Sequence, residues 1–262
     1  MLKKIPLYKL GGLNNKNYLF KKNNNKYVIR IPSKDNKNNF NYESIILKNI
    51  SHLNITPKII YNNKNTGVLI TKFIENASLN ITSYRDRNFI FNLSLTLKKL
   101  HNTHCNIYFD PFSHIENNIL YLKNINFEFD HDINKLLEEY YFIKNILTND
   151  ITYGLCHCDL NSSNILYKAN SIYLIDFEFS GICDIFFDLA TISWFLDDSM
   201  KLELLNCYFG YYDLSLKEKL ENYIFIVKLW NATWSYKKSL NNKTSYDYRL
   251  GANMILDDLL NL

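Results

Sequence analysis

The stretch of residues 155–178 constrains this chain more strongly than any other. It contains the pattern His157-x-Asp159-x-x-x-x-Asn164, then a short apolar run, and then Asp176. The apolar run predicts a buried strand, because a few consecutive apolar side chains bounded by polar residues are typical of one. The spacing therefore predicts a tight polar loop and a strand that bring two carboxylates and one carboxamide to a common site.

These three side chains, in this order, favour phosphoryl transfer from ATP. Such a reaction passes through a loose transition state, so the protein mainly positions the acceptor and neutralises charge with Mg²⁺. Asp159 suits the carboxylate that accepts the proton of the acceptor hydroxyl, and Asn164 and Asp176 suit metal binding. The alternative is that each aspartate caps a turn or a helix, as isolated aspartates commonly do. Because all three residues occur together, we favour a phosphotransferase site.

A second motif follows the first one directly. Residues 176–180 are Asp-Phe-Glu-Phe-Ser, and residues 187–190 are Phe-Asp-Leu-Ala. Both motifs together resemble the choline/ethanolamine kinase family, most closely bacterial choline kinases, among the kinase-like phosphotransferases that include aminoglycoside phosphotransferases. The resemblance covers nearly the whole chain. It implies ATP and Mg²⁺ as cofactors, places Glu178 at a second metal ion and near the acceptor, and makes Asp188 a support of the catalytic loop.

The resemblance also implies the fold. We expect an α+β, protein-kinase-like architecture of two lobes, with a small N-terminal antiparallel sheet and a larger, mainly helical C-terminal lobe. The expected boundary assigns residues 1–75 to a nucleotide-binding lobe and residues 76–262 to a lobe with the catalytic loop and the acceptor site. Apolar segments bounded by turn residues predict the strands of the sheet near residues 11–20, 26–31, 57–61 and 67–74.

Two adjacent glycines, Gly11 and Gly12, precede the first predicted hairpin. Glycine lets backbone amides approach phosphate groups closely, although two glycines in succession also form ordinary turns. The family carries a Gly-Gly-x-x-Asn loop at the corresponding place, and Asn15 completes that pattern here. The resemblance therefore favours a role for this loop in binding the nucleotide.

A charged pair is predicted beside the phosphates. Arg30 lies on the strand where kinases carry a phosphate-binding lysine, and the choline kinases that this chain resembles carry arginine there. Its expected partner is Glu43, at the start of a helix predicted for residues 42–50. Such a pair would hold the guanidinium against the phosphates. The alternative for Glu43 is a solvated residue in the first helical turn, where the helix dipole favours a negative charge.

The segment of residues 72–76 is the expected connection between the lobes. The backbone around Phe73 and Ile74 would meet the adenine ring, as the resemblance implies. No side chain in this segment selects one base over another, so the donor nucleotide follows from the resemblance alone.

The rest of the chain predicts helices. Apolar residues at helical spacing predict them near residues 85–104, 111–123, 133–147, 186–196, 216–240 and 246–260. His101 and His104 are interpreted as residues at a helix end, where the dipole favours a positive charge, rather than as metal ligands. A zinc site at Cys156-His157-Cys158 is disfavoured, because alternate residues of an extended segment point to opposite faces and no second ligand pair lies nearby.

Aromatic residues near the C-terminus could form the acceptor site. Trp230 and Trp234 are four residues apart and share one helix face, and Tyr246 and Tyr248 follow. A cage of such rings binds a quaternary ammonium group through cation–π attraction, although stripes at this spacing are more often core residues. Choline kinases carry a similar tryptophan pair spaced three apart, so Trp234 and Tyr248 match the family better than Trp230 does.

Composition excludes several classes of protein. The chain has 262 residues, 47% of them hydrophobic and 21% charged, which is typical of globular proteins. The net charge of +4 is too small to indicate nucleic-acid binding. No apolar run approaches the roughly 18 residues that span a membrane, and the first residues lack the apolar core of a signal peptide. With five cysteines, an odd number, we expect reduced thiols and a cytoplasmic location.

We therefore expect an enzyme that phosphorylates the hydroxyl of a small amino alcohol with ATP, choline first. Ethanolamine, thiamine and aminoglycosides are alternative acceptors for the same chemistry. A polycationic aminoglycoside needs many carboxylates, and after Glu221 the chain has only Asp247, Asp257 and Asp258. A catalytically silent kinase-like binding module is the alternative of another class, but it would be expected to have lost a motif residue.

Overall fold

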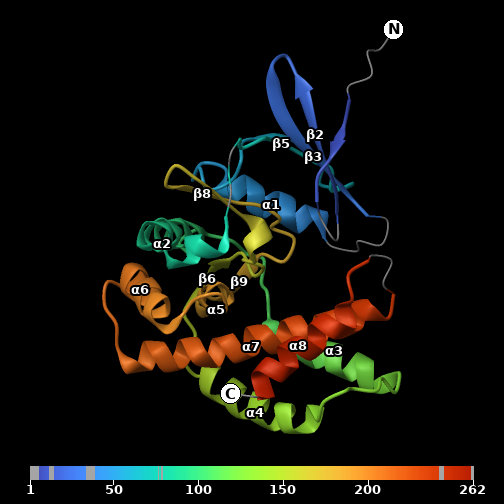
Figure 1. Cartoon of the computed structure of the whole chain (residues 1–262), viewed down its shortest axis with the longest axis vertical. Helices are drawn as coiled ribbons and strands as arrows, with labels where there is room; N and C mark the ends of the chain where they lie inside the picture. The colour runs from blue at the N-terminus through green and yellow to red at the C-terminus, as the bar shows by residue number, and fades with distance from the viewer. Residues whose placement is uncertain are drawn as a thin grey trace.

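The N-terminal part of the chain is an antiparallel sheet that lies above most of the helices in Figure 1. The computed structural model describes residues 6–11, 15–33, 39–75, 77, 79–241 and 245–260. Within these ranges the sheet has the strand order β1-β2-β3-β5-β4, and every neighbouring pair is antiparallel. Its strands are β1 (Tyr8–Lys9), β2 (Asn15–Lys22), β3 (Asn25–Pro32), β4 (Ile59–Asn62) and β5 (Leu69–Lys72).

Asparagines make the turn between β2 and β3. Asn23 and Asn24 have φ angles of 47° and 59°, and Lys22 lies opposite Asn25 in the register. A two-residue hairpin turn with positive φ at both positions matches the right-handed twist of the strands, and asparagine tolerates that conformation better than most residues. The Asn-rich segment is therefore a turn, as the sequence predicts.

Helix α1 (Phe40–Ile50) lies between the sheet and the helical part of the molecule (Figure 1). The Asn39 side chain caps its first turn by accepting from the backbone N–H of Tyr42. Ile46 and Ile50 are fully buried on its inner face, and Glu43 is buried one turn earlier. The helix thereby carries a carboxylate into the interior next to β3.

Helices make up most of the chain after residue 80. The α-helices are α2 (Arg87–His101), α3 (Pro111–Asn124), α4 (Ile133–Leu147), α5 (Phe186–Ser193), α6 (Asp198–Phe209), α7 (Leu214–Ser239) and α8 (Tyr248–Leu260). An aspartate caps the N-terminus of α2, α3, α4, α6 and α7 by accepting from backbone N–H groups of the first turn. These caps satisfy N–H groups that have no partner inside the helix, so the sequence fixes where each helix begins.

Helix α6 was not predicted. The sequence analysis treated the region of Asp197 only as the end of the preceding helix, but Asp197 is the N-cap of α6 and accepts from the backbone N–H of Met200. Gly210 ends α6 in the left-handed conformation, with φ of 83°. A cap residue marks a start as readily as a stop, and the apolar residues of this short helix do not follow a single stripe.

Two short antiparallel strand pairs carry the predicted motif. One pairs β6 (Tyr153–Cys156) with β9 (Gly181–Asp184), and the other pairs β7 (Ile165–Lys168) with β8 (Ser171–Leu174). The loop from β6 to β7 contains the short 3₁₀ helix η2 (Ser162–Asn164), and Asp176 follows β8. The loop and the carboxylate after the second strand therefore lie side by side, as the spacing of the motif predicts.

The hydrophobic core is continuous from α1 through α2, α5 and the middle of α7 to α8. Its largest fully buried side chains include Tyr140, Tyr223, Tyr236, Phe89 and Phe177. None of the helices in the described ranges has the length and apolar character needed to cross a membrane. The boundary of the two lobes at residue 75 stays a prediction.

Candidate active site

The predicted catalytic loop begins where β6 ends. His157 is fully buried, its Nε2 lies 3.0 Å from the carbonyl oxygen of Ile175, and its ring packs against Phe177. Cys158 has a φ angle of 64°, a left-handed conformation that is rare for a residue with a side chain. This turn redirects the backbone immediately before Asp159. Strained backbone of this kind persists where the surrounding structure holds it in place, and it occurs often at functional sites.

Two carboxamides hold the Asp159 carboxylate. Asn161 donates from Nδ2 to Oδ1 at 2.9 Å, and Asn164 donates from Nδ2 to Oδ2 at 2.8 Å. Asn164 also donates to the Asp159 carbonyl oxygen at 2.8 Å. Burial raises the pKa of Asp159 to about 7, with the charges of Asp176 and Glu178 acting in the same direction against the hydrogen bonds. A fixed carboxylate with such a pKa suits a general base, which works best near the operating pH.

Arg30 joins the sheet to Asp176, one of the predicted catalytic residues. It donates from Nη1 to Glu43 Oε1 at 2.7 Å and from Nη2 to Glu43 Oε2 at 2.5 Å, a bidentate pair. Nη1 also donates to Asp176 Oδ1 at 2.7 Å. Burial would lower the pKa of Arg30, but the bonds and the charge of Glu43 outweigh it and raise that pKa. The pairing expected from the sequence is present, and Glu43 is therefore not a solvated residue of the first turn.

Asp176, Asn164 and Glu178 offer oxygen ligands for a metal ion. Asp176 uses Oδ1 for Arg30, and Asn164 uses its Nδ2 for Asp159, so one oxygen of each has no donor among the described residues. Burial, and next the charge of Glu178, raise the pKa of Asp176 against the opposing charge of Arg30. Mg²⁺ prefers carboxylate and amide oxygens, and a cation would relieve this repulsion. These residues therefore fit Mg²⁺.

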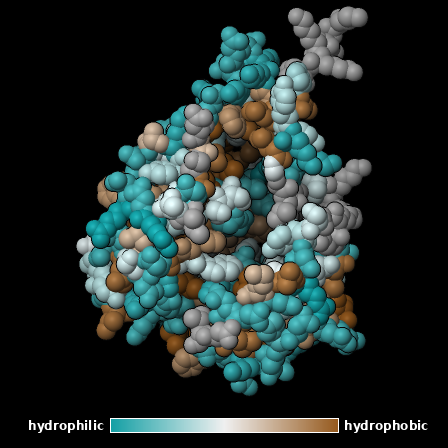
Figure 2. Space-filling model, viewed as in Figure 1, coloured by the Kyte–Doolittle hydropathy of each residue, from teal (hydrophilic) through white to brown (hydrophobic). Residues whose placement is uncertain are grey.

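A cavity of about 620 Å³ lies between the sheet and the helices, and we call it the central cavity. Figure 2 shows the molecule hollowed at this place. Except for Tyr248, every predicted site residue that the structure describes lines the central cavity, from Gly11 and Asn15 to Trp234. Gly12 lies outside the described residues. One cavity, open to the surface, thus joins the predicted nucleotide side to the predicted catalytic loop and the aromatic residues of α7.

The segment predicted to connect the lobes lines one wall of the central cavity. Phe73 and Ile74 both line it, together with Val28 and Leu174 from the sheet and from β8. The backbone N–H of Phe73 donates to the carbonyl oxygen of Lys26 at 3.0 Å, so this amide is already engaged within the sheet. The apolar walls can enclose a flat ring, while the amide of Phe73 has a structural role.

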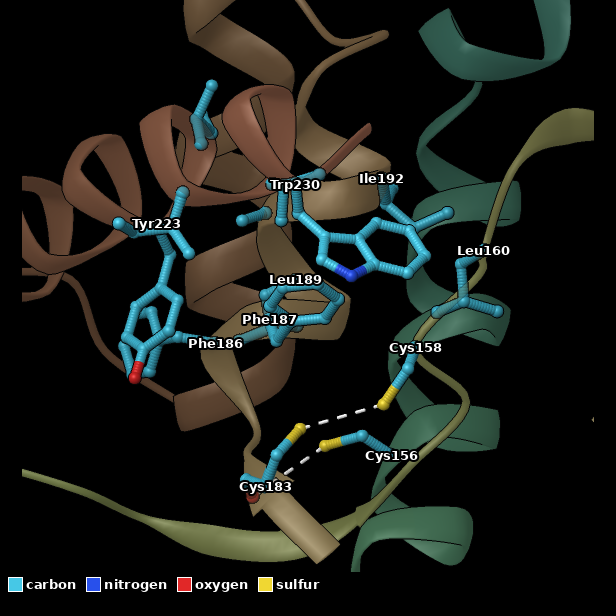
Figure 3. Packing of buried hydrophobic residues seen from close by; sticks show 14 of the residues in the cluster. Cys156, Cys158, Leu160, Cys183, Phe186, Phe187, Leu189, Ile192, Tyr223 and Trp230 are labelled. Carbon is cyan, nitrogen blue, oxygen red and sulfur yellow. Dashed lines mark hydrogen bonds between the residues drawn. The ribbon is translucent and has the colours of Figure 1, made fainter. Parts of the chain in front are cut away.

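The two tryptophans of α7 lie in different surroundings. Trp230 is only 4% exposed and meets Phe109, Phe179 and Phe187 edge to face, with centroids 5.5–5.9 Å apart. Figure 3 shows its indole ring packed among core side chains. Trp234 is partly exposed on the cavity wall. Trp230 therefore acts mainly as a core residue at the bottom of the cavity, and Trp234 is the better placed ring for a ligand.

Tyr248 stands behind Trp234. Their rings meet edge to face with centroids 5.7 Å apart, and Tyr246 packs on Tyr248 in turn. Tyr248 is buried, and it lines a separate hollow of about 430 Å³ next to Arg249 rather than the central cavity. In this arrangement Tyr248 supports the Trp234 ring, and direct contact of Tyr248 with an acceptor stays a prediction.

Comparison with known proteins decides the family. A model of the choline/ethanolamine kinase family matches residues 9–201, well over half of the chain. The chain belongs to the choline/ethanolamine kinase family. Among related proteins, Protein LicA of Haemophilus influenzae is 29% identical over 198 residues, which cover 72% of this chain and 57% of the relative. The match thus spans less than two thirds of that relative's length.

Solved structures of the family share the fold. A choline/ethanolamine kinase family protein from Mesorhizobium loti superposes with a TM-score of 0.86 at 22% identity, covering 98% of this chain and 87% of the other. Choline kinase LicA from Streptococcus pneumoniae superposes with a TM-score of 0.81 at 20% identity, covering 98% and 94%. The protein-kinase-like fold with its N-terminal sheet and helical C-terminal part, expected from the sequence, is therefore confirmed.

The structure adds a buried network behind the catalytic loop of this family member. Asp188 accepts from the backbone N–H groups of His157 and Cys158, both at 2.8 Å. His101 Nε2 lies 3.1 Å from the same carboxylate, and its Nδ1 lies 2.7 Å from the hydroxyl of Tyr208. Burial lowers the pKa of His101, but its contacts with Cys156 and Asp188 outweigh burial and raise that pKa to about 9. The network fixes the turn before Asp159.

Sequence reasoning placed His101 at a helix end but missed this role. His101 is the last residue of α2, yet it is buried and its two ring nitrogens are engaged. Ligand atoms of His101, Cys156 and Asp188 lie within 4.8 Å of one another, but hydrogen bonds already occupy His101 and Asp188. The cluster is therefore complete as a hydrogen-bonded network.

Buried thiols complete the packing beneath the loop. Cys156, Cys158 and Cys183 gather below Trp230 in Figure 3, and the sulfur atoms of Cys158 and Cys183 lie 3.7 Å apart. Burial raises the pKa of Cys158 to about 12. A thiol in such surroundings is unreactive, so these cysteines serve as small core residues.

Proposed function

We propose that this protein transfers the γ-phosphoryl group of ATP to the hydroxyl of a small amino alcohol, with choline as the first acceptor to test. The observation that carries the proposal is the central cavity, which brings Asp159, Asn164 and Asp176 into one space with Trp234. Membership in the choline/ethanolamine kinase family supports the reaction. The names of the relatives, which include a choline kinase, support the acceptor.

Asp159 is the base in this proposal. Its carboxylate is held by Asn161 and Asn164, so it meets the acceptor hydroxyl in a fixed orientation and takes its proton as the oxygen attacks phosphorus. The Asp188 network acts through the backbone and holds the loop on which Asp159 lies. Because the reaction is mainly positioning and charge neutralisation, this rigidity contributes directly to the rate.

Arg30 and the metal ligands serve the nucleotide in the same proposal. Glu43 orients the Arg30 guanidinium, which faces the phosphates together with the loop that contains Gly11 and Asn15. Asn164, Asp176 and Glu178 would hold Mg²⁺, which would neutralise the negative charge that develops on the transferred group. We also place the enzyme in the cytoplasm, where ATP is supplied.

The acceptor end favours an ammonium group. Trp234 presents an indole ring to the cavity, and the π face of tryptophan attracts a cation more strongly than that of the other aromatic side chains. Glu178 lines the same cavity and adds a negative charge. Aromatic attraction combined with few carboxylates suits a single quaternary ammonium group better than a polycation.

A coupled assay of ADP release tests the proposal across choline, ethanolamine, thiamine and kanamycin. We expect the highest kcat/KM with choline, and we expect Asp159→Asn to remove acceptor-dependent turnover. A higher kcat/KM with kanamycin than with choline would show that the acceptor is an aminoglycoside. A protein that binds ATP in calorimetry with Mg²⁺ but releases ADP with none of the four acceptors would instead be a silent binding module.

A further inference from the structure

The ring of Trp234 already carries a cation from this chain. The ammonium nitrogen of Lys238 lies 5.1 Å from the centroid of the Trp234 ring. The two residues are four apart near the C-terminal end of α7, so their side chains lie on the same face of the helix. A cation within about 6 Å of an indole centroid is attracted by the negative face of the ring.

Lys238 differs from most of the other lysines of α7. Lys219 pairs with Asp184 and Lys228 pairs with Asp258, each within 3.1 Å. Lys237 lies over the ring of Tyr121 and reaches the side chain of Asn118. Lys238 is exposed, and among the residues that the structure describes it forms no salt bridge. Its described side-chain partner is the indole ring of Trp234, and no carboxylate among the described residues neutralises its charge.

This charge affects any cationic ligand of the same ring. Trp234 lines the central cavity and Lys238 does not, so the ammonium of Lys238 lies on the ring outside the lining of the cavity. A ligand cation must either displace Lys238 or bind the ring against a positive charge nearby. Both routes weaken the binding of a cation. An uncharged ligand of the same shape loses affinity only where it must displace Lys238, because it meets no charge repulsion.

We propose that Lys238 is a specificity-determining residue that weakens the binding of cationic acceptors at Trp234. The inference rests on the proposed function, because it concerns the acceptor of that same site. Lys238 thereby raises the KM for a quaternary ammonium alcohol above the value that the aromatic ring alone would give. It also reduces the difference in KM between charged and uncharged acceptors.

A different role for Lys238 would be purely structural. A lysine in the last turn stabilises a helix through its dipole, and Lys237 and Lys238 both lie there. Lys237→Met is therefore a matched control, because it removes one positive charge from the same turn without touching Trp234. Lys238→Arg is the conservative variant, since arginine keeps both the charge and the ability to lie on an aromatic ring.

The test measures KM for choline and for its tert-butyl analogue, in which carbon replaces the ammonium nitrogen. We expect Lys238→Met to lower the KM for choline about two- to fivefold and the KM for the analogue by a smaller factor, with KM for ATP and kcat unchanged. Lys238→Arg and Lys237→Met should keep the KM of the unaltered protein. The difference should shrink in high salt, because the interaction is partly exposed to solvent.

Two results would overturn the inference. One is a KM for choline that Lys238→Met leaves unchanged, and the other is a KM that rises, which would make Lys238 a support of the Trp234 ring. If the unaltered protein does not phosphorylate choline, the proposed function fails instead. Calorimetric titration with tetramethylammonium then decides the inference separately: tighter binding to Lys238→Met supports it, and equal or weaker binding refutes it.

Discussion

Truncation of the two tryptophans of α7 should have different consequences, one for stability and one for acceptor binding. Trp230 is 4% exposed and lies among three phenylalanine rings, whereas Trp234 is partly exposed on the wall of the central cavity. We expect Trp230→Ala to act on stability and Trp234→Ala to act on the acceptor. Helical spacing alone does not distinguish the two residues, because both lie on one face of one helix.

The magnitudes follow from burial. Replacing a buried tryptophan by alanine costs about 3–5 kcal/mol, because the transfer free energy is lost and a cavity remains. For a domain of this size that corresponds to a decrease of about 6–20 °C in Tm. Trp234→Ala removes a cation–π contact instead, so the KM for choline should rise several-fold, with tenfold equivalent to ~1.4 kcal/mol.

Thermal melts and steady-state kinetics on the same preparations separate these effects. Trp230→Ala should melt early and lose activity in proportion to folded protein, with the ratio of KM values for choline and ethanolamine unchanged. Trp234→Ala should melt close to the unaltered protein and change that ratio against choline. A large decrease in Tm for Trp234→Ala with an unchanged ratio would refute the assignment of Trp234 to the acceptor site.

Three further changes test the catalytic end of the cavity. Asp159→Asn should lower kcat by about 10²–10⁴-fold. Burial raises the pKa of Asp159 to about 7, so ionising this carboxyl destabilises the unaltered protein as pH rises from about 4 through about 7. The Tm of the variant, measured relative to the unaltered protein, should therefore increase across that pH window. A flat Tm difference would contradict this. Asp176→Ala should abolish turnover without rescue by excess Mg²⁺, and full rescue would show that Asp176 is peripheral. Glu43→Gln removes the negative charge that pairs with buried Arg30, so it should raise the KM for ATP and lower the free energy of unfolding by up to about 3–5 kcal/mol. An unchanged KM for ATP would show that the Arg30–Glu43 pair does not contribute to binding the phosphates.

The parts of the site that the sequence predicts are those with local spacing. Asp159 and Asn164 lie five residues apart on one loop, and Asp176 follows the next hairpin, so short-range geometry brings them together. Arg30 and Glu43 pair across β3 and α1, and here the sequence alone left the solvated alternative open. The resemblance to a known family decided in favour of the pair, and the structure contains it.

The parts that the sequence missed depend on distant packing. The resemblance led us to expect Asp188 behind the catalytic loop, but nothing local in α2 or α6 indicates that His101 and Tyr208 join it. The different burial of Trp230 and Trp234 likewise depends on phenylalanines from other elements. The spacing of apolar residues shows on which face of a helix a residue lies, but which other element packs against that face depends on the whole fold.

The most direct test of the central claim is mass spectrometry of the product formed from choline, ATP and Mg²⁺. We predict phosphocholine in amounts equal to the ADP released, and a loss of both in Asp159→Asn while the variant stays folded and still binds ATP. ADP release without phosphocholine, or phosphocholine formation at an undiminished rate by Asp159→Asn, would contradict the account.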